Sequence, residues 1–272
     1  MKKVFSVFIL FLMLFGLVGC SRKEEQSPYG VWWWDSSLSN EYLDYADKQG
    51  INEIYYCDSN FDEEASAFIK LANKKGIKVY LLAGEYKWIE DDSELISLIA
   101  DYEVYQKNNP KAKFTGIHLD IEPHQHDEFG IRRTELITGL IELNYKLSTQ
   151  YSTIKFDYDI PFWFEDEITF NQETLPAYAH MIKYANRTFL MSYRDSAKGI
   201  YNVSKDEIEY AQKIGKTLIL GAETYSEEGD SVSFMEEGKT YMHQELKKLK
   251  DMLPSNFGIS IHHIKTWKNL QD

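Results

Sequence analysis

Residues 114–126 read F-T-G-I-H-L-D-I-E-P-H-Q-H, and this stretch carries the pattern that decides the fold. Three aliphatic residues alternate in it with three polar ones: Ile117, Leu119 and Ile121 with His118, Asp120 and Glu122. A strand points successive side chains to opposite faces, so one face is aliphatic and the other carries an imidazole and two carboxyl groups. Pro123 ends the strand, because proline cannot donate to a sheet ladder.

The two acids on the polar face bear on function. Burying Asp120 and Glu122 on a strand costs free energy unless they have partners or a chemical role. Their position at the exit of a strand therefore indicates general acid and base chemistry. The alternative is an amphipathic sheet on which this D-x-E simply faces water.

Strand and helix patterns alternate along the rest of the chain. Eight segments have the pattern of strands: 30–34, 51–57, 77–82, 114–122, 153–160, 188–193, 216–222 and 257–263. Helical spacing falls between them, at 39–48, 62–75, 93–108, around 136–147, and at 173–185, 204–214 and 242–253, with a terminal turn at 266–270. Strict alternation predicts a parallel sheet, and eight units in about 240 residues predict an α/β (β/α)₈ TIM barrel. We expect one domain over residues 29–272.

The competing architecture is an open, doubly wound sheet. That fold would need a glycine-rich phosphate-binding turn after an early strand. Residues 30–35 read G-V-W-W-W-D and do not supply one. The barrel is therefore the better prediction.

A barrel of this kind carries its active site at the carboxyl ends of the strands. Most of the predicted strand ends carry an acid or an aromatic residue: Asp35, Asp58, Glu85, Asp120, Glu122, Asp159, Tyr193, Glu223, His262, His263 and Trp267. All six tryptophans also fall on or near strand ends. Flat apolar rings with polar neighbours suit the faces of sugar rings, so we expect two or three of these tryptophans to line a carbohydrate cleft.

The N-terminus has the pattern of an export signal. Lys2 and Lys3 precede an apolar run over 4–18, which is too short for a membrane span of roughly 20 residues. Residues 17–20, L-V-G-C, resemble the lipobox of bacterial lipoproteins. That resemblance implies a signal peptide over 1–19, a lipidated Cys20 and a tether over 20–28, with the protein anchored by lipid, palmitate included, on the extracytoplasmic face of the cell membrane. An ordinary secretory signal is the alternative.

The charge balance restricts the partners. Loss of the first 19 residues would change the formal net charge from −13 to −15. Such an acidic protein is a poor ligand for nucleic acid or an anionic membrane surface, so membrane contact would come through the lipid alone. Cys57 is the only cysteine besides Cys20, which leaves no disulfide within the mature domain. We expect a monomer.

Three motifs resemble those of family 18 glycoside hydrolases, the chitinases and their relatives. Residues 114–122 resemble the fourth-strand signature, which begins F-D-G and ends D-x-D-x-E, and they match it at Phe114, Gly116, Asp120 and Glu122. Residues 191–193, M-S-Y, resemble the sixth-strand M-x-Y, and residues 216–225 resemble the seventh-strand K-L-x-L-G-x-P-x-Y. Trp267 lies slightly beyond the place of the eighth-strand tryptophan of that family.

The resemblance implies roles for these residues. Glu122 would be the general acid, and Asp120 would orient the substrate's N-acetyl group, whose oxygen acts as nucleophile. Three positions depart from the pattern: Thr115 and His118 replace aspartates, and Glu223 replaces a proline. His118 removes the aspartate expected behind Asp120, so the chain reads as an outlying relative.

Glu223 opens a second mechanism. Carboxyl groups at the ends of the fourth and seventh strands serve many retaining glycosidases as acid and nucleophile, about 5 Å apart. Glu122 and Glu223 would fit that layout without an N-acetyl sugar. The five histidines 118, 124, 126, 262 and 263 have no spacing typical of a metal site, so we expect neither a metal nor another cofactor.

Two functions remain open from sequence. The first is an extracytoplasmic glycosidase acting on an oligosaccharide or cell-wall glycan, with catalytic residues Glu122, Asp120, Tyr193 and Glu223. The second is a sugar-binding lipoprotein without activity on the same barrel. In both, the expected substrate-binding residues are Trp33, His118, Asp159, His263 and Trp267.

Overall fold

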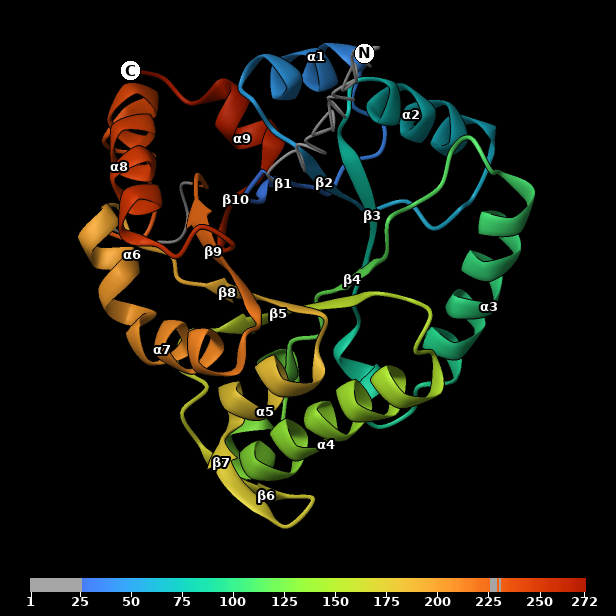
Figure 1. The fold of residues 1–272 in the computed structure, drawn as a ribbon, viewed down its shortest axis with the longest axis vertical. Helices are drawn as coiled ribbons and strands as arrows, with labels where there is room; N and C mark the ends of the chain where they lie inside the picture. The colour runs from blue at the N-terminus through green and yellow to red at the C-terminus, as the bar shows by residue number, and fades with distance from the viewer. Residues whose placement is uncertain (1–25, 226–228, 230) are drawn as a thin grey trace, which may run out of the picture.

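A computed structural model describes residues 26–225, 229 and 231–272; the expected signal peptide and Cys20 lie outside these residues. Eight parallel strands close into a barrel, in the order β1-β10-β9-β8-β5-β4-β3-β2 (Figure 1). Their bounds are Tyr29–Trp33 (β1), Glu53–Tyr56 (β2), Lys78–Ala83 (β3), Ile117–Leu119 (β4), Phe156–Pro161 (β5), Arg187–Met191 (β8), Thr217–Glu223 (β9) and Gly258–His262 (β10). The predicted single-domain TIM barrel is confirmed.

Helices surround this barrel as an outer ring (Figure 1). The α-helices are Asn40–Lys48 (α1), Glu63–Lys74 (α2), Ser93–Asn108 (α3), Phe129–Gln150 (α4), Ala177–Tyr184 (α5), Ala197–Val203 (α6), Lys205–Ile214 (α7), Gly238–Met252 (α8) and Ile264–Asn269 (α9). Two short 3₁₀ helices, Tyr86–Ile89 (η1) and Pro123–Gln125 (η2), follow β3 and β4. In the described part of the chain, no helix has the length and apolarity needed to cross a membrane.

Local signals explain where the helices start and stop. The carboxylate of Asp62 accepts a hydrogen bond from the amide of Ala65 at 2.9 Å and caps α2. Gly215 ends α7 with φ = +70°, a left-handed conformation that glycine adopts without a Cβ penalty. Both ends agree with the sequence pattern.

Two apolar cores follow from the alternation along the strands. The larger lies between sheet and helices and includes Ile117, Leu119 and Ile121. The smaller fills the inside of the barrel and consists of Trp32, Tyr55, Tyr80, Leu82, Phe189 and Ile219. The polar residue His118 faces this inner core, as the alternation predicts.

An ionic cluster lies inside the barrel below the inner aromatic core. Arg187 donates from Nη1 to Glu53 Oε2 at 2.8 Å and from Nη2 to Asp157 Oδ2 at 2.6 Å. Its guanidinium also stacks on Tyr80, 4.6 Å from the ring centroid. Glu53 and Asp157 are 2% and 0% exposed, so each depends on Arg187 for charge compensation.

The segment before α5 differs from the prediction of a helix over 173–185. Strands β6 (Glu167–Phe170) and β7 (Glu173–Pro176) form an antiparallel hairpin there, and the helix starts only at Ala177. The fixed φ of Pro176 allows it to precede the first turn, and the residues before it pair with β6 instead. The hairpin projects beside α4 and α5 (Figure 1).

The chain enters the barrel slightly before β1. The carbonyl of Ser27 accepts a hydrogen bond from the Asn52 side chain at 3.0 Å, and the carbonyl of Pro28 accepts one from the amide of Ile259 at 3.0 Å. The last residues of the expected tether are thus bound to the amino end of the barrel. The strand ends that carry the candidate site lie at the opposite end.

Candidate active site

The β4 exit brings its two acids to the barrel mouth. The amide of Asp120 donates to the carbonyl of Ala83 at 3.0 Å, which keeps β3 and β4 together beyond the last paired residues. Gly84 makes this approach possible, because a Cβ there would lie 1.8 Å from the carbonyl oxygen of Asp120. The backbone of Asp120 is thereby held beside the end of β3, and its side chain faces the barrel interior.

Glu122 is the acid at the surface of the mouth. Its side chain is 15% exposed. Gln125 donates a hydrogen bond from Nε2 to Glu122 Oε2, and His124 Nε2 lies 3.7 Å from Oε1. A substrate oxygen can reach this carboxyl group from solvent, which a general acid requires.

Asp120 lies deeper and has a perturbed carboxyl group. Burial raises its pKa well above the usual range, and the charges of Asp159 and Glu122 raise it further. Its Oδ1 atom is buried and has no hydrogen-bond partner among the described residues. Asp120 therefore offers a polar oxygen to a ligand in the mouth.

Asp159 on β5 lies level with Asp120. Leu119 pairs with Tyr158 in the β4–β5 register, so the next residues of the two strands are neighbours. Asp159 Oδ2 accepts from Trp32 Nε1 at 3.2 Å and lies 2.6 Å from His118 Nε2. Burial also raises the pKa of Asp159 well above its usual range. Asp159 is 2% exposed, and its Oδ1, like that of Asp120, is buried without a hydrogen-bond partner among the described residues, so its substrate-binding role stays a prediction. Its charge also acts on the neighbouring Asp120.

His118 is buried and uncharged. Burial lowers its pKa to about 3, although Asp157 partly opposes this shift. Its ring stacks on Tyr55, with centroids 4.5 Å apart, and meets Phe189 edge-on at 4.4 Å. The expected substrate contact of His118 is therefore wrong, since the side chain is 0% exposed and packs inside the barrel.

Glu223 and His262 form a second acid–histidine pair on the other side of the mouth. They are directly opposite each other in the β9–β10 register, and His262 Nδ1 lies 2.7 Å from Glu223 Oε2. Glu223 Oε1 accepts from the amides of Thr224 and Tyr225 at 2.6 and 2.7 Å. With 1% exposure and both oxygens bonded, Glu223 has no oxygen free to attack a sugar.

Tyr193 lies next to this pair. Its ring stacks on His262 with centroids 6.0 Å apart, and Gly221 leaves the space for it, since a Cβ there would lie 2.9 Å from Tyr193 Cε1. Burial raises the pKa of Tyr193 well above its usual range, and the charges of Glu223 and Asp159 add to this. The hydroxyl group therefore stays protonated and can donate to a ligand.

The remaining expected contacts fall elsewhere. Trp33 is 0% exposed and packs at a tilt against Phe68 in the outer core, because a one-residue step along β1 turns a side chain to the other face. Trp267 is also 0% exposed and packs against Tyr45, since α9 turns it away from the mouth. The predictions for both are wrong.

His263 follows His262 by one residue and therefore points to the other face, away from the mouth. It borders a side cavity of about 420 Å³ together with Thr224, Tyr225 and Thr266, while His262 faces the mouth. Two mouth residues, Trp34 and His262, and the inner-core residue Trp32 beneath them were not among the expected site residues. Strand alternation could have predicted that Trp32 and His262 face inward. Runs such as W-W-W and H-H, however, contain no alternation of polar and apolar residues that shows which of their members face inward.

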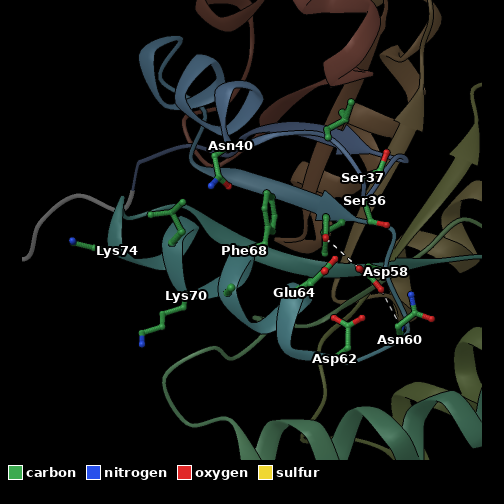
Figure 2. Close-up of a pocket in the computed structure, with 14 residues that line it drawn as sticks. Ser36, Ser37, Asn40, Asp58, Asn60, Asp62, Glu64, Phe68, Lys70 and Lys74 are labelled. Atoms are coloured by element: carbon green, nitrogen blue, oxygen red, sulfur yellow. Dashed lines mark hydrogen bonds between the residues drawn. The ribbon is translucent and has the colours of Figure 1, made fainter.

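A groove opens between the loop after β1 and helix α2. It measures about 650 Å³ and is bordered by the loop after β1, the end of β2 and the outer face of α2. Figure 2 shows Asp58 at the strand end of this groove and Lys70 and Lys74 on the helix side. Asp58 is held by the hydroxyl of Tyr56 at 3.2 Å and by the amide of Asn60 at 3.0 Å. Within residues 26–225, 229 and 231–272, no three His, Cys, Asp or Glu side chains are grouped to hold a metal ion.

Solved structures similar to this chain include chitinases and a spore cortex-lytic enzyme. A GH18 chitinase from Pseudoalteromonas aurantia is 12% identical, with a TM-score of 0.60 over 88% of this chain and 95% of that one. A chitinase from Bacteroides thetaiotaomicron is 12% identical, with a TM-score of 0.58 over 89% and 91%. The spore cortex-lytic enzyme SleL of Bacillus megaterium is 9% identical, with a TM-score of 0.56 over 90% and 74%. No protein-family model matches the chain, and no curated protein matches its sequence. The chain is therefore a distant, chitinase-like TIM barrel by its fold.

Proposed function

We propose that this protein is an extracytoplasmic, lipid-anchored glycoside hydrolase that cleaves an oligosaccharide or cell-wall glycan containing N-acetyl sugars. The observation that carries the proposal is the pairing of an accessible acid, Glu122, with a deeper acid, Asp120, at the mouth of a chitinase-like barrel. Acid pairs in unlike environments are the usual arrangement for glycoside hydrolysis.

The chemistry assigned to these residues is substrate-assisted hydrolysis. Glu122 protonates the glycosidic oxygen while the acetamide oxygen of the substrate attacks the anomeric carbon, so that the leaving sugar departs and an oxazoline forms. Asp120 accepts the proton of the acetamide N–H as the oxazoline closes and returns it as the ring opens, and the hydroxyl of Tyr193 donates a hydrogen bond to the acetamide oxygen. Water then attacks the anomeric carbon, with Glu122 as general base, and opens the oxazoline.

The state of Glu223 supports this route over a protein nucleophile. Its two carboxylate oxygens are occupied by two amides and by His262, and the side chain is 1% exposed. An attacking carboxylate would have to break one of these bonds and reach the mouth from a buried position. We therefore assign Glu223 to support rather than to nucleophilic attack.

A second candidate function is carbohydrate binding without catalysis. His118 favours it, because an uncharged imidazole stands where the resemblance implies an aspartate. Asp159 counts against it, since this residue returns a carboxyl group to the same side of Asp120. The groove of about 650 Å³ between the loop after β1 and α2 would suit further units of a glycan in either case.

The test is hydrolysis of an unactivated N-acetylglucosamine oligomer, followed by product chromatography. Glu122→Gln should lower the rate by about 10²–10⁴-fold, because the leaving oxygen loses its proton donor. Asp120→Asn should also be severe, and oligomers without N-acetyl groups should not react. Glu142→Gln, the same change on the exposed face of α4, is the matched control. Undiminished hydrolysis by Glu122→Gln would refute the mechanism and leave the binding function in front.

A further inference from the structure

We propose that the indole of Trp34 is the platform on which a pyranose ring stacks in this site, and that Glu223 and His262 hold it in position. The inference rests on the proposed carbohydrate function, and it names the sugar-binding surface of the same mouth. The ligand class is a pyranose that presents an apolar face of C–H groups.

The first support is a chain of hydrogen bonds that ends on Trp34. The amides of Thr224 and Tyr225 fix one oxygen of Glu223, and the other oxygen accepts the Nδ1 proton of His262 at 2.7 Å. In the neutral imidazole, above the pKa of His262, Nε2 is then an acceptor, and Trp34 Nε1 donates to it at 2.9 Å. Each member determines the orientation of the next, so backbone amides at the end of β9 ultimately orient an indole ring at the end of β1.

The second support is the exposure of this ring. Trp34 is 36% exposed, whereas Trp32, Trp33 and Trp267 are at most 1% exposed. A free surface tryptophan would sample several rotamers, but this one is fixed by its N–H group while part of its apolar ring stays in water. Such a preorganised ring binds a sugar face at low entropic cost.

The third support is the position of the ring relative to the acids. Strand β10, which carries His262, is a neighbour of β1 and lies opposite β4 in the eight-strand order. Trp32 joins the two sides, because its ring meets His262 edge-on with centroids 5.8 Å apart and its Nε1 donates to Asp159 Oδ2 at 3.2 Å. A sugar that stacks on Trp34 would therefore lie between the indole on one side and the acids of the β4 side on the other.

The experiment is titration calorimetry with tri-N-acetylchitotriose as the probe, in a Glu122→Gln background that prevents turnover. Trp34→Ala should weaken binding by at least tenfold, and Trp34→Phe should weaken it less, because a ring remains but its tether is lost. Glu223→Gln should also weaken binding several-fold, although this residue does not touch the sugar. The amide would turn a donor toward Nδ1, and the opposite tautomer would then oppose the Trp34 N–H group.

The combined change separates positioning from a general loss of structure. Trp34→Ala with Glu223→Gln should bind no worse than Trp34→Ala alone, since both remove the same platform. Tyr145→Ala, which removes an aromatic ring of 37% exposure from α4, should bind like the parent. Circular dichroism would verify the fold of each variant.

The outcomes distinguish this inference from the proposed hydrolysis. Binding that depends on Trp34, together with a wild-type chain that cleaves nothing, would support the platform and refute the hydrolase. Binding that is unchanged in Trp34→Ala would overturn the platform whatever the activity. A folded parent that does not bind the probe would overturn it as well.

Discussion

Arg187 inside the barrel gives a test of how the fold is held together beneath the site. Replacing it by methionine keeps an unbranched apolar stem against Tyr80 but removes the guanidinium that bonds both Glu53 and Asp157. Removing one partner of a buried ion pair costs about 3–5 kcal/mol, because the remaining charge stays buried. The two carboxyl groups are 2% and 0% exposed, so water cannot compensate for the loss.

Neighbouring donors place the expected cost at the lower end of that range. The hydroxyl of Tyr55 donates to Glu53 at 3.1 Å, Lys78 lies 3.8 Å from the same carboxylate, and Asn186 donates to Asp157 at 2.8 Å. We therefore expect a loss of about 3 kcal/mol in the free energy of unfolding. For a domain of this size that corresponds to a decrease in Tm of roughly 6–12 °C, measured by thermal unfolding at pH 7.5.

Two controls define the result. A triple variant, Arg187→Met with Glu53→Gln and Asp157→Asn, removes every charge of the cluster and should recover most of the lost stability. Lys205→Met breaks an exposed pair with Glu209 and should change stability by no more than about 0.5 kcal/mol. A Tm for Arg187→Met within about 2 °C of the parent would refute the reasoning, because the buried charges would then not need their counter-ion.

Four further predictions concern the site and its anchoring. Asp159→Asn should lower the pKa of Asp120, since the charge of Asp159 contributes to raising it. The pKa would be measured by carboxyl ¹³C NMR, and an unchanged pKa would contradict the prediction. Burial lowers the pKa of His262, but the hydrogen-bonded carboxylate of Glu223 outweighs burial, so the pKa is raised above 6.5. The free energy of unfolding that the parent has in excess of His262→Gln should therefore be full below pH 6.5 and decline as pH rises through the raised pKa. Gly84→Ala should destabilise the fold by about 1–3 kcal/mol in urea unfolding, because its Cβ would clash with the carbonyl of Asp120, and a neutral effect would argue against the close approach. Cys20→Ala should release the protein from membranes, and a variant that stays membrane-bound after a salt wash would exclude a lipid anchor there.

The barrel was predictable because its signal is repeated. Eight strand patterns with helical spacing between them restrict the topology strongly even where single boundaries are uncertain. The prediction fails at 173–176, where β7 pairs with β6 instead of starting a helix, and α5 begins only after Pro176, at Ala177.

The inward-facing side chains were predictable only on strands with polar contrast. In β4 the alternation of aliphatic and polar residues assigned His118 and Asp120 correctly to the inner face. In β1 and β10 both faces are buried, so W-W-W and H-H have no contrast, and the sequence did not show that Trp32 and His262 face inward instead of Trp33 and His263. Strand alternation says nothing about Trp267, because this residue lies in helix α9, beyond the end of β10.

The charge beside Asp120 shows why a linear motif is an incomplete description of this site. Read along β4, the chain lacks the aspartate that the family pattern implies at His118. Read across the sheet, the β4–β5 register brings Asp159 level with Asp120, and Trp32 and His118 both contact its carboxylate. The second acid lies on the neighbouring strand, where side chains of the same parity face the inside of the barrel. A substitution within the motif can therefore leave the charge of a second carboxyl group acting on Asp120.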